Sequence, residues 1–165
     1  MRKADNQSNG RAGLAKSQRG AVAIEFAIIF LLIFTLFYAI INYSLMFLLQ
    51  ASFAHASEEG ARAAIAVDPL AFPSDSEYIS AGVIPQVRTT VGNSLVWLPD
   101  GIKQKVLGAG NSRVQVDVTA NVLTVRVEYA NYMSQPILPS FNLPNGQPML
   151  PLPSQLRGTA VLRLF

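Results

Sequence analysis

Cysteine is absent from the 165-residue sequence, and histidine occurs once, as His55. No disulfide, thiol nucleophile or cysteine metal site is therefore available, so a domain outside the cytoplasm has to be stabilised by packing alone. One histidine cannot build a histidine metal site or a catalytic triad. The adjacent Glu58 and Glu59 point about 100° apart on a helix and cannot converge as an acid and base pair. The sequence thus predicts no enzyme, no catalytic residue, no metal and no cofactor.

Charge is also scarce and unevenly placed. Charged residues make up 14% of the chain, and the net charge of +3 originates in the first nineteen residues. The charges of the remaining chain nearly cancel, which gives no support to nucleic-acid binding, because that would need a basic surface on a folded domain. A basic segment directly before a hydrophobic run is the positive-inside signal. It predicts a cytoplasmic N-terminus and places the residues beyond about 50 outside.

One long apolar run follows the basic segment, from Phe26 to Leu49. At 1.5 Å per residue, about 24 residues reach about 36 Å, enough to cross a hydrocarbon core of roughly 30 Å with some tilt. No proline occurs before Pro69, so nothing stops the helix when it leaves the membrane. We predict a disordered leader over residues 1–20 and one helix over residues 21–67, with the membrane span at residues 26–49.

The outer part of this helix carries small residues four apart, Ala56, Gly60 and Ala64. Such a row predicts close helix packing, although an alanine-rich segment also produces this spacing by helix propensity alone. A secretory signal cleaved before Ser57 is an alternative for the segment, with Ala54-His55-Ala56 as its small-residue site. That alternative needs an apolar region of about 7 to 15 residues, far shorter than this one.

A second, shorter helix is predicted beyond Pro69. Ser74 and Glu77 fit a capping box at its start, Pro85 is expected to kink it, and Gly92 is its expected C-terminal cap. Apolar residues recur every four positions and give it one apolar stripe: Ile79, Val83, Val87 and Val91. After this helix, Trp97 is expected to anchor the core beside Leu95 and Leu98, ahead of a turn at Pro99-Asp100-Gly101.

Strand patterns occupy the last third of the chain. Apolar and polar residues alternate over residues 113–118 and 123–129, which predicts a hairpin, and a third strand is predicted in residues 156–165. In the third strand, Arg157 and Arg163 are expected opposite acidic residues such as Glu128 or Asp117. Because a sheet with one apolar face must bury that face, we expect a three-stranded antiparallel meander covered by helices.

The predicted fold class is therefore α+β, with a long N-terminal transmembrane helix and an extracytoplasmic α+β domain over residues 68–165. Within that domain, residues 131–155 are rich in proline and are predicted to form an extended excursion. Its apolar residues either cap the core or stay exposed for a partner: Ile137, Leu138, Phe141 and Met149.

The most specific pattern lies where the leader meets the helix, at Arg19, Gly20, Ala21, Glu25 and Phe26. Together these residues resemble a type IV prepilin processing site. A glycine lets the backbone enter a membrane-embedded protease in an extended form, because it has no side chain to clash. A cut after Gly20 would create an amino group at Ala21 that can pair with the costly buried carboxylate of Glu25. The alternative for Glu25 is an interfacial carboxylate without a role.

The wider pattern resembles the TadE-like pseudopilins, which are minor pilins of the Flp/Tad (tight adherence) type IVb pilus and secretion system. It consists of RGAVAIEFAIIF, then ASEEGARAA, then a β-rich half, and its specific residues are Gly20, Glu25, Glu59, Gly60, Ala61 and Arg62. The chain is longer than a bare Flp major pilin, and it lacks the cysteines and long insert of TadG-type relatives.

The resemblance implies a role in assembling a pilus used for adhesion and biofilm formation. It implies cleavage after Gly20 by a prepilin peptidase, and a single-pass position in the bacterial inner membrane with a periplasmic C-terminal domain. The implied partners are that peptidase, membrane lipid, other pilins or pseudopilins and the Tad inner-membrane assembly platform. The subunit would stay in the membrane or enter the pilus at the cell surface. The alternative is an uncleaved, signal-anchored periplasmic binding or sensor module.

Overall fold

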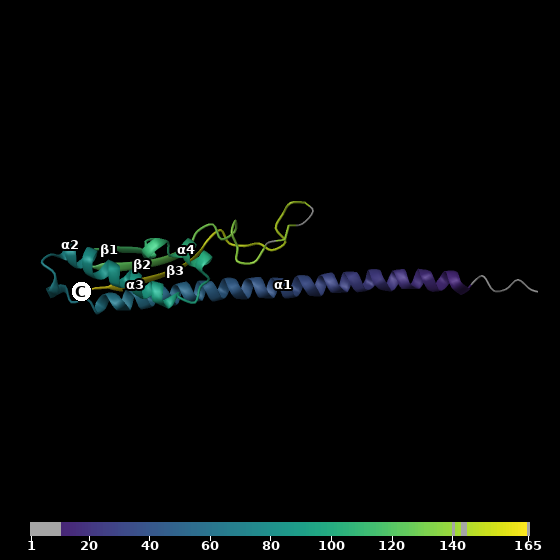
Figure 1. The fold of residues 1–165 in the computed structure, drawn as a ribbon, viewed down its shortest axis with the longest axis horizontal. Helices are drawn as coiled ribbons and strands as arrows, with labels where there is room; N and C mark the ends of the chain where they lie inside the picture. The colour runs from purple at the N-terminus through teal and green to yellow at the C-terminus, as the bar shows by residue number, and fades with distance from the viewer. Residues whose placement is uncertain (1–10, 140, 143–144, 165) are drawn as a thin grey trace, which may run out of the picture. The chain divides into compact units, whose positions relative to one another are not determined.

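The computed structural model describes residues 11–139, 141–142 and 145–164, with side chains from Gly20 onward. Its contacts divide the chain into two units, Met1–Tyr43 and Ser44–Phe165. One helix, α1 (Arg11–Ile65), runs through both units (Figure 1). The fold is α+β, as predicted, since α1 is followed by further helices and a three-stranded sheet.

The start of α1 corrects the sequence prediction. The helix begins at Arg11 rather than Ala21, so the predicted disorder is wrong for residues 11–20, while residues 1–10 of the predicted leader lie outside the described residues. Alanine, leucine, lysine, arginine and glutamine dominate this segment and favour helix, and extending an existing helix costs far less than nucleating one.

The other end of α1 lies close to its expected position. The helix ends at Ile65, and a short 3-10 helix, η1 (Pro69–Ala71), follows. The Asp68 carboxylate accepts a hydrogen bond of 2.9 Å from the backbone N–H of Leu70 and caps η1. The Asp-Pro pair therefore marks the exit from the helix, because the residue before proline avoids helical geometry.

Within the first unit, most side chains from Gly20 to Ile41 are exposed, large apolar ones included. A helical stretch within Gly20–Ile65 has a mean hydropathy of 2.6 and is long and apolar enough to cross a membrane. An exposed helix of this composition fits a single-pass membrane anchor, because contact between so large an apolar surface and water is unfavourable.

In the second unit, the next helical segment is built from three consecutive pieces: α2 (Asp75–Glu77), the π-helical η2 (Tyr78–Val83) and α3 (Ile84–Ser94). The Ser74 hydroxyl accepts a hydrogen bond of 3.3 Å from the N–H of Glu77, which is the predicted N-terminal cap. Pro85 sits in the first turn of α3, directly after the π turn. The wider π turn accommodates the proline, whose ring would otherwise clash with the preceding turn.

Gly92 is not the C-terminal cap that the sequence predicted, because α3 continues through it to Ser94. A Cβ atom at Gly92 would collide with the side chain of Asn111. The Asn111 amide donates a hydrogen bond of 3.0 Å to the backbone carbonyl of Arg88. Glycine is therefore needed here for the close approach of Asn111 and not for a turn.

Two further expectations for the segment after α3 were wrong. Pro99-Asp100-Gly101 starts a helix, α4 (Asp100–Val106), instead of forming an isolated turn. An acidic first residue and lysines in the last turn complement the helix dipole and favour this outcome. Leu95 and Leu98 are buried as expected, but Trp97 between them is 49% exposed, since residues three apart share a side that the intervening residue does not.

The sheet confirms the predicted meander. Strands β1 (Gln115–Thr119), β2 (Val122–Tyr129) and β3 (Leu156–Arg163) pair antiparallel in the order β1-β2-β3. The β1–β2 hairpin turns through Ala120 and Asn121, which both adopt positive φ angles, 49° and 65°. Such angles match the turn that suits the natural twist of two paired strands.

The register of the sheet settles the expected cross-strand pairs. Glu128 lies opposite Arg157, as predicted, and both belong to strand positions outside the core. Arg163 lies opposite Val122 instead of an acidic residue, because β3 runs antiparallel and reaches the start of β2 there. Asp117 is likewise paired with Thr124.

One face of the sheet packs on the helices (Figure 1). Four side chains of β2 are buried on this face: Leu123, Val125, Val127 and Tyr129. A Cβ atom at Gly158 of β3 would collide with the backbone of Phe53 and Ala54 in α1. The backbones of α1 and β3 therefore lie directly against each other, which only glycine permits.

Between β2 and β3, the described residues of 131–155 form turns and one isolated bridge, between Asn142 and Pro148. Ile137 packs against the core, which agrees with the first of the two roles considered for the apolar residues. Phe141 is 51% exposed, whereas Leu138 and Met149 are less exposed. The excursion thus both covers the core and presents apolar surface.

Candidate functional site: the N-terminal motif and its surroundings

Gly20 lies inside α1, where nothing comes within 4 Å of the Cβ atom that another residue would add. Glycine inside a helix costs roughly 0.5–1 kcal/mol relative to alanine, because it has more freedom to lose. Packing within the described chain does not explain this cost. In this respect Gly20 resembles Gly101, which also has nothing within 4 Å of an added Cβ atom, so its meaning depends on the residues around it.

Glu25 and Ala21 lie on the same side of α1, since residues four apart in a helix are neighbours one turn away. Both are exposed, as is Phe26, while Arg19 shares the helix and its side chain is outside the described ones. In the uncut chain α1 extends back to Arg11, so Glu25 lies in a helix interior. A cut after Gly20 would place Glu25 one turn from the new N-terminus at Ala21, where the dipole favours an acid.

A row of stacked aromatic rings starts at Phe26 and was missed in the sequence. The rings of Phe26 and Phe30, and of Phe30 and Phe34, have centroids 6.1 Å apart, and Phe34 and Tyr38 follow at 6.3 Å. The i, i+4 spacing was the available signal. The row makes one side of the exposed helix rigid and bulky, which suits contact with lipid or with another helix.

The small-residue row of α1 is inside the domain. Ala56, Gly60 and Ala64 are all buried. A Cβ atom at Gly60 would meet Val91 at 2.7 Å and Val87 at 3.2 Å, both on α3. The row is thus covered by the domain's own elements and is not a free surface for another subunit. In the motif Glu59, Gly60, Ala61 and Arg62, the arginine alone is exposed.

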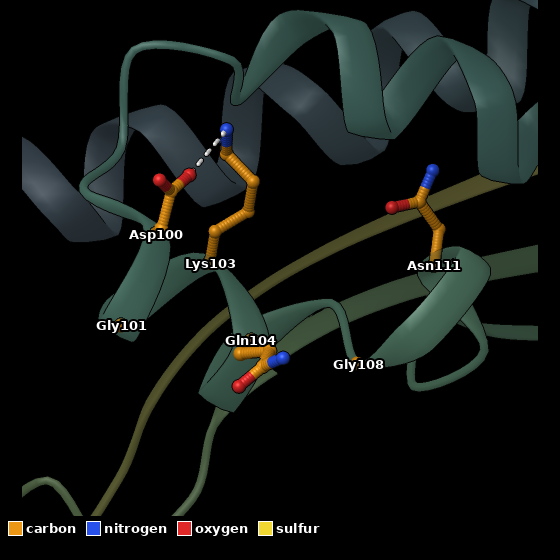
Figure 2. A pocket seen from close by; sticks show the side chains of 6 residues that line it. All are labelled: Asp100, Gly101, Lys103, Gln104, Gly108 and Asn111. Carbon is orange, nitrogen blue, oxygen red and sulfur yellow. Dashed lines mark ion pairs between the residues drawn. The ribbon is translucent and has the colours of Figure 1, made fainter.

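A polar hollow of about 370 Å³ lies beside α4 (Figure 2). It is lined by Asp100, Gly101, Lys103, Gln104, Gly108 and Asn111. In this hollow an ion pair joins Lys103 Nζ to Asp100 Oδ1 at 3.6 Å, and the aspartate side chain is fully exposed. Such an exposed pair contributes little, and its groups do not converge on a point where a substrate could react.

Two tyrosines of the domain, Tyr78 and Tyr132, have a raised pKa because both are buried. Among the residues that the structure describes, no three His, Cys, Asp or Glu side chains gather closely enough to hold a metal ion. Burial raises the pKa of Tyr132 above its ordinary value, and the nearby Tyr129 adds to this rise. The two rings form an edge-to-face pair with centroids 5.4 Å apart, which identifies them as core residues.

An apolar hollow of about 130 Å³ lies on the second unit, and we name it the Trp97 groove. It is lined by Leu45, Leu48, Leu49, Trp97, Leu98, Pro99, Ile102 and Ile137. Three of these residues belong to the end of the apolar run of α1, and Ile102 belongs to α4. The sequence predicted that Trp97 is a buried anchor of the core, whereas it lines this groove and is 49% exposed.

Comparison with protein-family models gives a match on the N-terminal motif. Residues 20–62 match a family model described as TadE-like protein. Neither the curated proteins nor the solved structures contain a match to the chain. The matched range contains both Gly20 and Glu25 and ends at Arg62. The resemblance predicted from the sequence is therefore confirmed over these residues.

Proposed function

We propose that this chain, whose residues 20–62 match the TadE-like family, is a minor pilin or pseudopilin required to assemble a Flp/Tad-type adhesive pilus. It is cut between Gly20 and Ala21 by a prepilin peptidase, in a bacterial inner membrane. Its N-terminus is cytoplasmic and its α+β domain is periplasmic. After the cut it stays in the membrane or joins the pilus, where it contacts other pilins and the Tad assembly platform.

The observation that carries the proposal is Gly20 together with Glu25 five residues later. The glycine interrupts good helix formers, no neighbouring group within 4 Å requires its lack of a side chain, and Glu25 follows at the spacing of a prepilin site. Cleavage by a protease that binds its substrate in an extended form explains a glycine here, because glycine weakens the helix and leaves room for the enzyme. The peptidase must unwind α1 around Gly20 before it cuts.

The cut changes the electrostatics of the remaining helix. Ala21 becomes a free amine, and Glu25 becomes its neighbour one turn away or the partner of an amine on another subunit. A carboxylate at membrane depth is costly unless it is paired. Pairing across subunits would favour a bundle of helices over a solitary anchor, which gives Glu25 a role in assembly.

Processing is tested by N-terminal sequencing of the protein extracted from membranes with and without the peptidase. We expect a chain that begins at Ala21 only when the peptidase is present. Gly20→Leu should block the cut, whereas Gly101→Leu is the matched control, since Gly101 is also a helical glycine with nothing within 4 Å of an added Cβ. A chain that still begins at Met1 in the presence of the peptidase contradicts the proposal and supports the uncleaved anchored module.

The role of Glu25 is tested separately with Glu25→Ala. We expect normal cleavage and a loss of pilus assembly, because the removed carboxylate pairs only after the cut. An uncut Glu25→Ala chain would instead assign the residue to recognition by the peptidase. A cut chain that assembles pili normally would remove Glu25 from the mechanism.

The bundle is tested by photo-crosslinking in whole cells. A crosslinker at Phe30, on the stacked aromatic row, should capture another pilin-like helix. A crosslinker at Leu32 is the matched control, because two residues along a helix turn the side chain through about 200°. Crosslinks to lipid alone at both positions would indicate a solitary anchor.

A further inference from the structure

The Trp97 groove brings a half-exposed tryptophan against the end of an apolar helical run. Leu45, Leu48 and Leu49 line it from α1, and these positions share one side of a helix. Leu48 is 51% exposed and Trp97 is 49% exposed. Large apolar side chains that are exposed side by side indicate a surface that binds an apolar or interfacial partner.

The place of the groove along α1 indicates which environment this is. From Phe26 to Leu45 the apolar run rises by about 28 Å, and to Leu49 by about 34 Å, compared with roughly 30 Å for the hydrocarbon of a bilayer. The outer boundary of the hydrocarbon therefore falls between Leu45 and Leu49. The next residue, Gln50, is polar and exposed. Trp97 lines the same groove as Leu45 and Leu49, so it lies close to this boundary.

The second wall of the groove has the two-sided character of a membrane interface. In α4, Ile102 lines the groove, while Lys103 and Gln104 line the polar hollow of Figure 2. The apolar side of α4 is thus turned to the groove and its polar side to a wet surface. Tryptophan prefers the boundary between hydrocarbon and headgroups, because its ring is apolar and its N–H is polar.

We propose that the Trp97 groove is a lipid-binding surface, at which Trp97 lies in the outer membrane–water interface and phospholipid acyl chains cover the exposed parts of Leu48 and Trp97. This contact would hold the domain against the bilayer at the point where α1 leaves it. The proposal requires α1 to be a membrane anchor, but neither the cut after Gly20 nor a pilus.

The chain provides its own probe, because Trp97 is its only tryptophan. The full chain is placed in phosphatidylcholine vesicles that carry a nitroxide quencher in the headgroup region, at a shallow acyl carbon or at a deep acyl carbon. We expect an emission maximum at shorter wavelength than that of tryptophan in water. We also expect the headgroup and shallow quenchers to lower the emission more than the deep quencher does, with iodide in the water having a weak effect.

Two variants calibrate the depth scale in the Trp97→Phe background. Leu36→Trp places the probe in the middle of the apolar run, so the deep quencher should act most strongly. Leu70→Trp places it in η1, at a side chain that is 92% exposed, so iodide alone should quench it.

Three results would overturn the proposal. If Trp97 behaves like the Leu70→Trp probe, the groove faces water. If Trp97 is protected from iodide and from every lipid quencher, protein covers the groove, either another copy of the chain or another part of this one. Equal quenching of Trp97 and the Leu36→Trp probe by the deep label would also contradict an interfacial position.

Discussion

Replacing Gly158 with alanine would add a methyl group where β3 meets the backbone of α1. The added carbon would collide with the carbonyl carbon and oxygen of Phe53 and the nitrogen of Ala54. These are backbone atoms of a helix, so they cannot rotate away as a side chain would. Overpacking of a well-packed core costs typically 1–3 kcal/mol, and the backbone contact places Gly158→Ala at about 3 kcal/mol or above.

Two other glycines make the magnitude testable within the same domain. At Gly60 the added carbon meets the tips of Val91 and Val87, at 2.7 Å and 3.2 Å, which are side-chain atoms that can shift at a cost of about 1–2 kcal/mol. At Gly101 it meets nothing within 4 Å, so alanine should stabilise α4 by up to about 1 kcal/mol. The expected order of stability is Gly101→Ala, parent, Gly60→Ala, Gly158→Ala.

The assay is urea or thermal unfolding of the full chain in detergent, followed by near-ultraviolet circular dichroism, which reports the packing of the domain. A loss of about 3 kcal/mol corresponds to a fall in Tm of about 10 °C for a domain of this size. If Gly158→Ala unfolds at the same temperature as the parent while Gly60→Ala is destabilised, then the direct contact between α1 and β3 is refuted. The sheet would then be separated from the helix at that point.

Two further predictions concern the same domain. Because burial raises the pKa of Tyr132 above its ordinary value of 10.0, the unfolded chain ionises first and the free energy of unfolding should fall as the pH rises from about 10 toward the folded pKa. Tyr132→Phe should weaken this alkaline loss in unfolding measured between pH 8 and 11, and an unchanged slope would contradict the burial of the hydroxyl. Ser74→Ala should cost about 1 kcal/mol, since it removes the acceptor of the Glu77 N–H at the start of α2. The control Ser76→Ala, two residues further on and inside α2, should cost less in the same urea titration, and equal losses would argue against the cap.

The local rules in the sequence predicted the elements well where one rule acted alone. Alternation over β1 and β2 predicted the strands and their buried face, and the Ser74 cap was confirmed. The rules failed where two of them competed. Helix propensity extended α1 back to Arg11, although composition suggested disorder, and the dipole of α4 turned an expected Pro-Asp-Gly turn into a helix.

The glycines show the same limit more clearly. Gly92 was read as a cap, and Gly158 carried no signal at all, because a strand glycine looks like a weak strand residue. Both are explained by what another segment places against them, Asn111 in one case and α1 in the other. Trp97 was expected to be buried because it stands beside Leu95 and Leu98, but its exposure depends on which side of the chain these leucines occupy.

The sequence by itself determined the long apolar run, the motif at Gly20 and Glu25 and the α+β class, because each depends on spacing along the chain. A helix of fixed rise and a strand of period two convert that spacing directly into length and faces. Only the tertiary structure decided that the small-residue row of α1 is buried, that β3 touches α1 at Gly158 and that Trp97 opens onto a groove beside Leu48. These contacts join residues far apart in the sequence, and local propensities do not specify which distant segment packs against a given residue.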